Sequence, residues 1–124
     1  MKLRIHQNSL RLRLTQKEVA ELRCSGRVDA AICFALDRVL SYSIEMHGEA
    51  APMSVTLDES AIRVSIPTAI ATRWADSDDV SIEGSQAVSE KPDLQLLIEK
   101  DFQCLHRTAE EPDAYPNPLA TLSA

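Results

Sequence analysis

The chain has 124 residues, of which 44% are hydrophobic and 26% are charged, and its formal net charge is −6. This length is enough for one hydrophobic core and requires no second domain. No apolar run approaches about 18 residues, and an alternating pattern begins directly after Met1 without a hydrophobic signal segment. We therefore expect a cytoplasmic protein that does not cross a membrane.

The three cysteines, Cys24, Cys33 and Cys104, are an odd number and show no CxxC spacing. A disulfide framework and a zinc ribbon are thereby disfavoured, and reduced thiols are expected. The charge is unevenly distributed along the chain. Residues 1–27 hold seven Lys or Arg against two Glu, whereas the remainder holds six Lys or Arg against seventeen Asp or Glu. This asymmetry indicates either an anionic partner for the N-terminal region or charge complementarity within the fold.

The first half of the chain predicts strand, strand, helix, strand, strand. Leu3 and Ile5 alternate with polar residues, a turn follows at residues 7–8, and the alternation resumes over residues 10–14, so a hairpin is expected. Thr15-x-x-Glu18 is a capping box that starts a helix, and Ser25-Gly26 ends it. Two more strands are expected over about residues 28–34 and 39–46.

The second half predicts the same order of elements. Strands are expected around residues 55–57 and 62–66, after which Pro67 suits the first turn of a helix. Ile70 and Trp74 form the buried stripe of that helix, and residues 76–79 end it. Two further strands are expected at residues 80–82 and 94–98.

The two halves match in their apolar positions when the chain is aligned with itself 52 residues further on. Leu22 then meets Trp74, Val28 meets Val80, and Ile44 meets Leu96. This pattern predicts one ββαββ unit present twice, over residues 2–48 and 53–101, within a single domain of residues 1–106. A half of about 50 residues buries too little apolar surface to be stable alone. Residues 107–124 are acidic and rich in proline, which predicts an extended or disordered tail.

The predicted core consists of the apolar residues on the inward side of these elements: Leu10, Leu12, Leu14, Ile44, Met46, Ile62, Val64, Ile66, Trp74, Leu96 and Ile98. Phe34 falls on the buried side of its pattern as well, so it and Trp74 are expected in the core rather than as stacking platforms.

Two stretches resemble a known family. Residues 8–14 precede a capped helix, and residues 63–67 are followed by Ser77-Asp78-Asp79-Val80; both are similar to the AbrB/MazE swapped-hairpin domain of transition-state regulators and antitoxins. The resemblance implies a mainly β fold with two short helices, in which the duplicated units form one pseudo-dimeric barrel within a single chain. It also implies DNA binding or an antitoxin-like role. Residues 99–106 and the N-terminal end further resemble a small bacterial family of unknown function.

The first hairpin carries the candidate site. A two-residue turn places Arg4 opposite Arg11 and Lys2 opposite Arg13, and like charges directly opposite each other are destabilising. In one interpretation these four cations position nucleic-acid phosphate, as the family resemblance implies. In the other, carboxylates of neighbouring strands, Glu99, Asp101 or Glu45, neutralise them within the fold.

Other functional motifs are sparse. Cys104-Leu105-His106 with Asp101 nearby is the best candidate for a metal or small-molecule site, but zinc needs three or four convergent ligands, and no metal or other cofactor is predicted. No recognisable nucleophile, base and orienting group can be assembled, so no enzymatic activity is expected. The acidic tail suits either a toxin-binding arm or a solvated or folded-back segment. A regulatory or interaction protein is the favoured function, with DNA, or a protein bound by the tail, as the expected partner. The oligomeric state is left open.

Overall fold

The computed structural model describes residues 1–48 and 51–102, and these form a mainly β fold with two short helices, as predicted. None of the helices in this part of the chain is long and apolar enough to span a membrane. In chain order the elements are β1 (Lys2–His6), β2 (Ser9–Leu14), α1 (Gln16–Ser25), β3 (Arg27–Ala35), β4 (Arg38–His47), β5 (Ser54–Asp58), β6 (Ala61–Pro67), α2 (Thr68–Asp76), β7 (Ser81–Gln86) and β8 (Leu94–Lys100).

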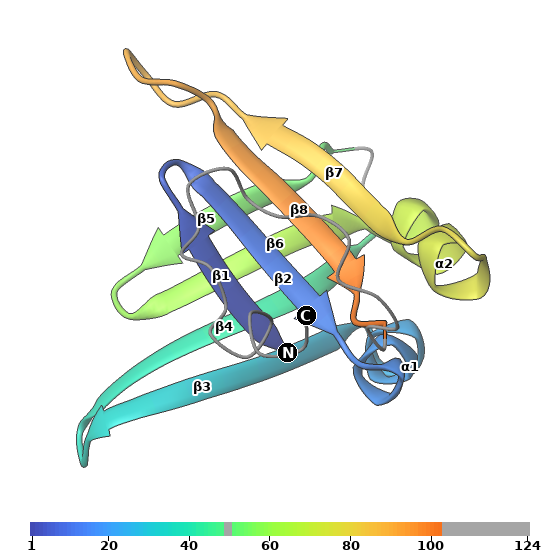
Figure 1. The fold of residues 1–124 in the computed structure, drawn as a ribbon, viewed down its shortest axis with the longest axis horizontal. Helices are drawn as coiled ribbons and strands as arrows, with labels where there is room; N and C mark the ends of the chain where they lie inside the picture. The colour runs from blue at the N-terminus through green and yellow to red at the C-terminus, as the bar shows by residue number, and fades with distance from the viewer. Residues whose placement is uncertain (49–50, 103–124) are drawn as a thin grey trace, which may run out of the picture.

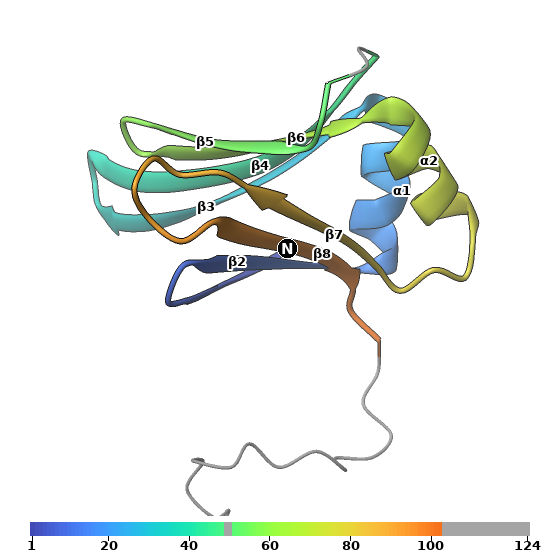
Figure 2. The same cartoon turned by 90° about the horizontal axis from the view of Figure 1, so that it is seen from above.

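The strands form two four-stranded sheets, ordered β1-β2-β8-β7 and β3-β4-β6-β5 (Figure 1). In each sheet a parallel pair, β2 with β8 or β4 with β6, lies between two antiparallel hairpins. Each sheet therefore takes one hairpin from each half of the chain. The sheets lie in two layers, with α1 and α2 together at one end and the β3–β4 turn at the other (Figure 2).

The predicted barrel is not closed. Edge strands β5 and β7 belong to different sheets, and a side chain rather than a main-chain ladder links them. Val55 donates its backbone N–H to Oε1 of Gln86 at 2.8 Å, and Nε2 of Gln86 donates to the Val55 carbonyl at 2.9 Å. The Gln86 amide thus occupies the hydrogen-bonding groups that a continuing sheet would need. The duplicated, pseudo-dimeric origin of the fold stays a prediction.

The core lies between the two sheets and under the helices, largely where the sequence placed it. Of the predicted core residues, Met46 and Ile62 are only half-buried and pack against the others, which are all buried. Leu22, Val28 and Ile82 are buried as well. The prediction for Phe34 is wrong: its side chain is 71% exposed, because β6 pairs with β4 only from Ser41 onward and the outer part of the β3–β4 hairpin extends beyond the core.

The predicted spacing of 52 residues between matching positions does not hold after the helices. Val28 pairs with Ile44 in one sheet and Ile82 pairs with Ile98 in the other, so the equivalent residues are 54 rather than 52 positions apart. Val80, which the spacing of 52 matched to Val28, is half-exposed and lies before β7. The connection after α2 is three residues longer than the connection after α1, and α2 is one residue shorter than α1, which together account for the shift.

Local interactions define where the helices begin and end. The Thr15 hydroxyl accepts the backbone N–H of Glu18, and the Glu18 side chain accepts the backbone N–H of Thr15, which is the predicted capping box. Gly26 ends α1 in the left-handed conformation, with φ of 79°. At the end of α2, Nε1 of Trp74 donates to the Val80 carbonyl at 3.1 Å, which satisfies the polar atom of this buried ring.

Candidate interaction surfaces

The four predicted site residues lie together on the β1–β2 hairpin, in the register that the sequence indicated. Lys2 is opposite Arg13 and Arg4 is opposite Arg11, so alternation places all four on the outward face of their sheet. The sequence therefore located this basic cluster correctly. Which anions contact it depends on the neighbouring strand.

Carboxylates of the chain itself contact the cluster. Glu99 on β8 accepts a hydrogen bond from Nε of Arg13 at 2.8 Å, and the same oxygen lies 3.4 Å from Nε of Arg11. Lys2 Nζ lies 3.0 Å from the carboxylate of Asp101. The parallel pairing of β2 with β8, which places Arg13 directly beside Glu99, brings these groups together.

The third candidate carboxylate, Glu45, lies elsewhere. It pairs with Arg27 at 2.6 Å, at the base of the β3–β4 hairpin in the other sheet. Glu99 and Asp101 therefore supply the internal negative charge, and their positions favour neutralisation of the basic hairpin within the fold.

The second candidate segment, residues 101–106, is described only at its start. The Asp101 backbone N–H donates to the Leu14 carbonyl at 2.9 Å, which holds its carboxylate near Lys2. Cys104 and His106 lie outside the described residues, as does the predicted tail. Among the residues that the structure does describe, no group of three His, Cys, Asp or Glu side chains is placed to hold a metal ion.

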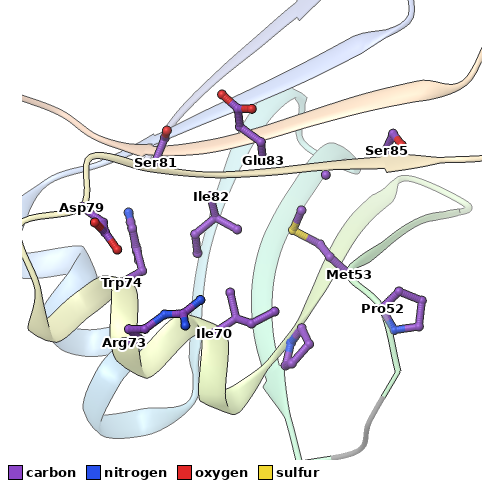
Figure 3. Close-up of a pocket in the computed structure, with 12 residues that line it drawn as sticks. Pro52, Met53, Ile70, Arg73, Trp74, Asp79, Ser81, Ile82, Glu83 and Ser85 are labelled. Carbon is purple, nitrogen blue, oxygen red and sulfur yellow. The ribbon is translucent and has the colours of Figure 1, made fainter.

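A groove of about 490 Å³ lies between α2, β7 and the segment that precedes β5 (Figure 3). Trp74 and Ile82 form part of its apolar floor, and Arg73 and Asp79 lie at its rim. Met53 reaches across the groove to Gly84, where a Cβ atom would lie only 2.1 Å from the Met53 methyl. The lining includes two serines and two carboxylates but no histidine, cysteine or lysine, so it suits apolar contact better than nucleophilic chemistry.

A third surface, which the sequence interpretation missed, is the end of the β3–β4 hairpin. This hairpin projects beyond the neighbouring strands at the lower left of Figure 1. We define the apolar tip as Ile32, Phe34, Leu36 and Val39, and each of these is exposed: 48%, 71%, completely and 38%, respectively. The available signal was the uncharged run of residues 30–36 between Asp29 and Asp37.

Both faces of the tip are apolar. Ile32 pairs with Leu40 and continues the row of inward-facing residues that begins with the buried pair Val28 and Ile44. Val39 pairs with Cys33 on the opposite face. Phe34 lies at a register shift between Cys33 and Ala35, so it has no directly opposed residue on β4. The tip therefore has apolar surface in excess of what its own strand partners cover.

The comparison with known families gives a match over nearly the whole chain, residues 1–119. The chain belongs to DUF7009, a family of unknown function. Neither a curated protein nor a solved structure gives a significant match. Membership of DUF7009 agrees with the predicted resemblance to a family of unknown function, whereas the AbrB/MazE resemblance stays a prediction.

Proposed function

We propose that this chain is a non-catalytic interaction protein that binds a protein partner through the apolar tip of the β3–β4 hairpin. The observation that carries the proposal is the exposure of Ile32, Phe34, Leu36 and Val39 together on one projecting element. Single exposed apolar residues are ordinary, but contiguous ones mark interaction sites. Aromatic and aliphatic anchors of this kind supply much of the binding energy of protein interfaces.

The free energy available from burying the apolar tip supports a protein partner. Removing apolar surface from water is favourable by roughly 25 cal/mol per Å², so covering a mostly exposed Phe or Leu side chain yields on the order of 1–3 kcal/mol. Four such side chains on one hairpin supply enough free energy to offset part of the entropy lost on association. A nucleic-acid backbone offers no comparable apolar surface to this hairpin.

The basic hairpin supports nucleic-acid binding less well. Phosphate binding gains most where cations lack internal partners, because their neutralisation then releases counterions. Here the Glu99 carboxylate lies against two of the four cations and Asp101 against a third. An approaching phosphate would meet these carboxylates as well as the cations.

Site-specific photo-crosslinking in living cells tests the proposal. A photoreactive residue at position 36, at the end of the apolar tip, is expected to give discrete protein adducts that disappear when Phe34→Asp is added. Leu57 on β5 is a matched control position, since it is an apolar residue of the same sheet and is 72% exposed. An absence of adducts at position 36, or the same adducts at positions 36 and 57, would contradict the proposal.

A second experiment tests nucleic-acid binding directly. The fluorescence anisotropy of a labelled DNA duplex is measured at several salt concentrations, with the wild-type chain and with the double reversal Arg4→Glu and Arg11→Glu. We expect no salt-sensitive binding by either protein, and a lower melting temperature for the double reversal because it places new carboxylates near Glu99. Salt-sensitive binding that the reversal abolishes would instead assign the function to the basic hairpin.

A further inference from the structure

The edge of β3 is the least protected of the four sheet edges in the described structure. Proteins guard such edges with charged residues, short strands or covering groups, because free N–H and C=O groups pair readily with another strand. β1 carries Lys2 and Arg4, β5 has only five residues, and the Gln86 side chain links β5 to β7. β3 has nine residues, and its outer part carries no charge from Ala30 onward.

We propose that a second copy of this chain occupies the apolar tip, with the two β3 edges paired antiparallel about a twofold axis at Ile32. This inference rests on the proposed function and names the partner. This pairing would join the β3-containing sheet of each copy into one continuous eight-stranded sheet. Its strand order would be β5-β6-β4-β3 of one copy followed by β3-β4-β6-β5 of the other. An interface formed by the same patch on both subunits is the usual arrangement of a homodimer.

The sequence of β3 matches itself in this register. Ile32 lies opposite Ile32 of the second copy, and Phe34 lies opposite Ala30 of the second copy, so the largest side chain meets one of the smallest. Alanine leaves space for the Phe34 ring, which lacks a directly opposed residue on β4. The pairing therefore provides Phe34 with a cross-strand neighbour.

Charge selects the same register. With Ile32 at the axis, Arg27 at the start of β3 lies toward Asp37 of the second copy, which is in the turn just after Ala35, so opposite charges meet at each end of the interface. Moving the axis to Cys33 would align Asp29 with Asp37, two like charges. Moving it to Ala31 would separate Arg27 from Asp37 and place Phe34 opposite Val28, which is larger than alanine. A twofold axis at Ile32 is thus the register in which charges and side-chain sizes agree.

The test is the oligomeric state of the full chain, measured by sedimentation velocity over about 1–200 μM because dimer formation depends on concentration. We expect the wild-type chain to form a dimer and Ile32→Lys to be a folded monomer with the circular dichroism spectrum of the wild-type chain, because residue 32 is half-exposed. Leu57→Lys is the matched control and is expected to dimerise normally. A wild-type monomer at all concentrations, or a dimer that Ile32→Lys leaves intact, would overturn the proposal.

Cross-linking tests the register. In a chain with Cys24, Cys33 and Cys104 replaced by Ser, Ile32→Cys is expected to form an interchain disulfide, because opposed Cα atoms of an antiparallel pair are about 4.5–5.5 Å apart. Ala30→Cys is the control and is expected to stay reduced. A disulfide at position 30 and not at 32 would overturn the register.

The two proposals fail in distinguishable ways. A monomeric chain that still gives tip-dependent adducts with other proteins at position 36 would overturn the second-copy proposal and leave the proposed function intact. A monomeric chain without such adducts would overturn both.

Discussion

Glu99 on β8 accepts a hydrogen bond from Arg13 of the parallel strand β2 at 2.8 Å, and the same carboxylate oxygen lies 3.4 Å from Arg11. One anion therefore offsets two cations that lie on the same face of the sheet. Its side chain is 14% exposed, whereas those of Arg11 and Arg13 are 38% and 45% exposed. Because Glu99 is the most buried of these three side chains, we expect its removal to lower the free energy of unfolding most.

We predict that Glu99→Gln lowers the free energy of unfolding by about 0.5–1 kcal/mol at low salt, because it removes the negative charge beside Arg11 and Arg13 on a hairpin where like charges face each other. The difference from wild type is expected to shrink between about 20 mM and about 500 mM NaCl, as screening weakens the repulsion. Urea unfolding at both salt concentrations measures this. Glu83→Gln, an exposed carboxylate on the same face, is the control, and an equal effect there would argue against the special position of Glu99.

Glu18 predicts a pH dependence of stability. Burial acts to raise the pKa of this carboxyl group, but hydrogen bonds from the Met1 ammonium and from Thr15 outweigh burial and hold the pKa below its ordinary value of 4.5. A lowered folded-state pKa stabilises the fold fully above the unfolded value, and this contribution is lost as the pH falls through the folded value. The free energy of unfolding should therefore decrease below about pH 4.5, partly through Glu18.

The corresponding variant is Glu18→Gln, compared with Glu21→Gln as an exposed carboxylate of the same helix. We expect Glu18→Gln to be less stable than wild type at pH 7 and to lose less stability on acidification to about pH 3. Urea unfolding at the two pH values gives the comparison. An acid dependence of Glu18→Gln as steep as that of wild type would show that other groups dominate.

The sequence predicted most elements because their signals are local. Alternation of apolar residues indicates a strand, and the Thr15 and Glu18 pair indicates the start of a helix. The shift of the repeat was not predictable in the same way. Side chains of a strand alternate with a period of two, so a shift of two residues keeps the same face inward and leaves the pattern of Val80 and Ile82 unchanged.

The surroundings of the basic hairpin and of the apolar tip depend on which strands pair in the sheets, and the sequence alone does not indicate that pairing. The basic cluster was predictable because a two-residue turn determines the register of Arg4 and Arg11. The contact between Glu99 and Arg13 was not predictable in this way, because it requires β2 to lie beside a strand 86 residues later in the chain. Phe34 follows an inward pattern but is exposed, because the outer part of the β3–β4 hairpin extends beyond the residues of β4 that pair with β6.

The change of spacing from 52 to 54 residues gives a stability prediction for Val80 and Ile82. Ile82→Ala is expected to lower the free energy of unfolding by about 2–4 kcal/mol, since Ile82 is buried in the core. Val80→Ala is expected to change it by less than about 1 kcal/mol, because Val80 is 51% exposed. Chemical denaturation of the two variants measures the difference. A larger loss at Val80 would support the spacing of 52 residues over the spacing of 54.

The side-chain amide of Gln86 links edge strands β5 and β7. It accepts a hydrogen bond from the backbone N–H of Val55 and donates one to the Val55 carbonyl. Gln86→Glu keeps the size of the side chain but removes the donor at neutral pH, and it places a carboxylate against the Val55 carbonyl. We predict a loss of about 1–3 kcal/mol in the free energy of unfolding at pH 7, the cost of leaving a half-buried polar group without its partner.

Acidification distinguishes this interaction from a general effect of an added negative charge. Near pH 4 the carboxyl group that Gln86→Glu introduces takes up a proton, and its O–H donates to the Val55 carbonyl while its other oxygen accepts the Val55 N–H. The stability difference from wild type should therefore narrow between pH 7 and about pH 4. Gln95→Glu, at an exposed position of β8, serves as the control and should show a much smaller difference at pH 7. A Gln86→Glu deficit that is constant with pH would show that the two hydrogen bonds to Val55 contribute little to holding the sheets together.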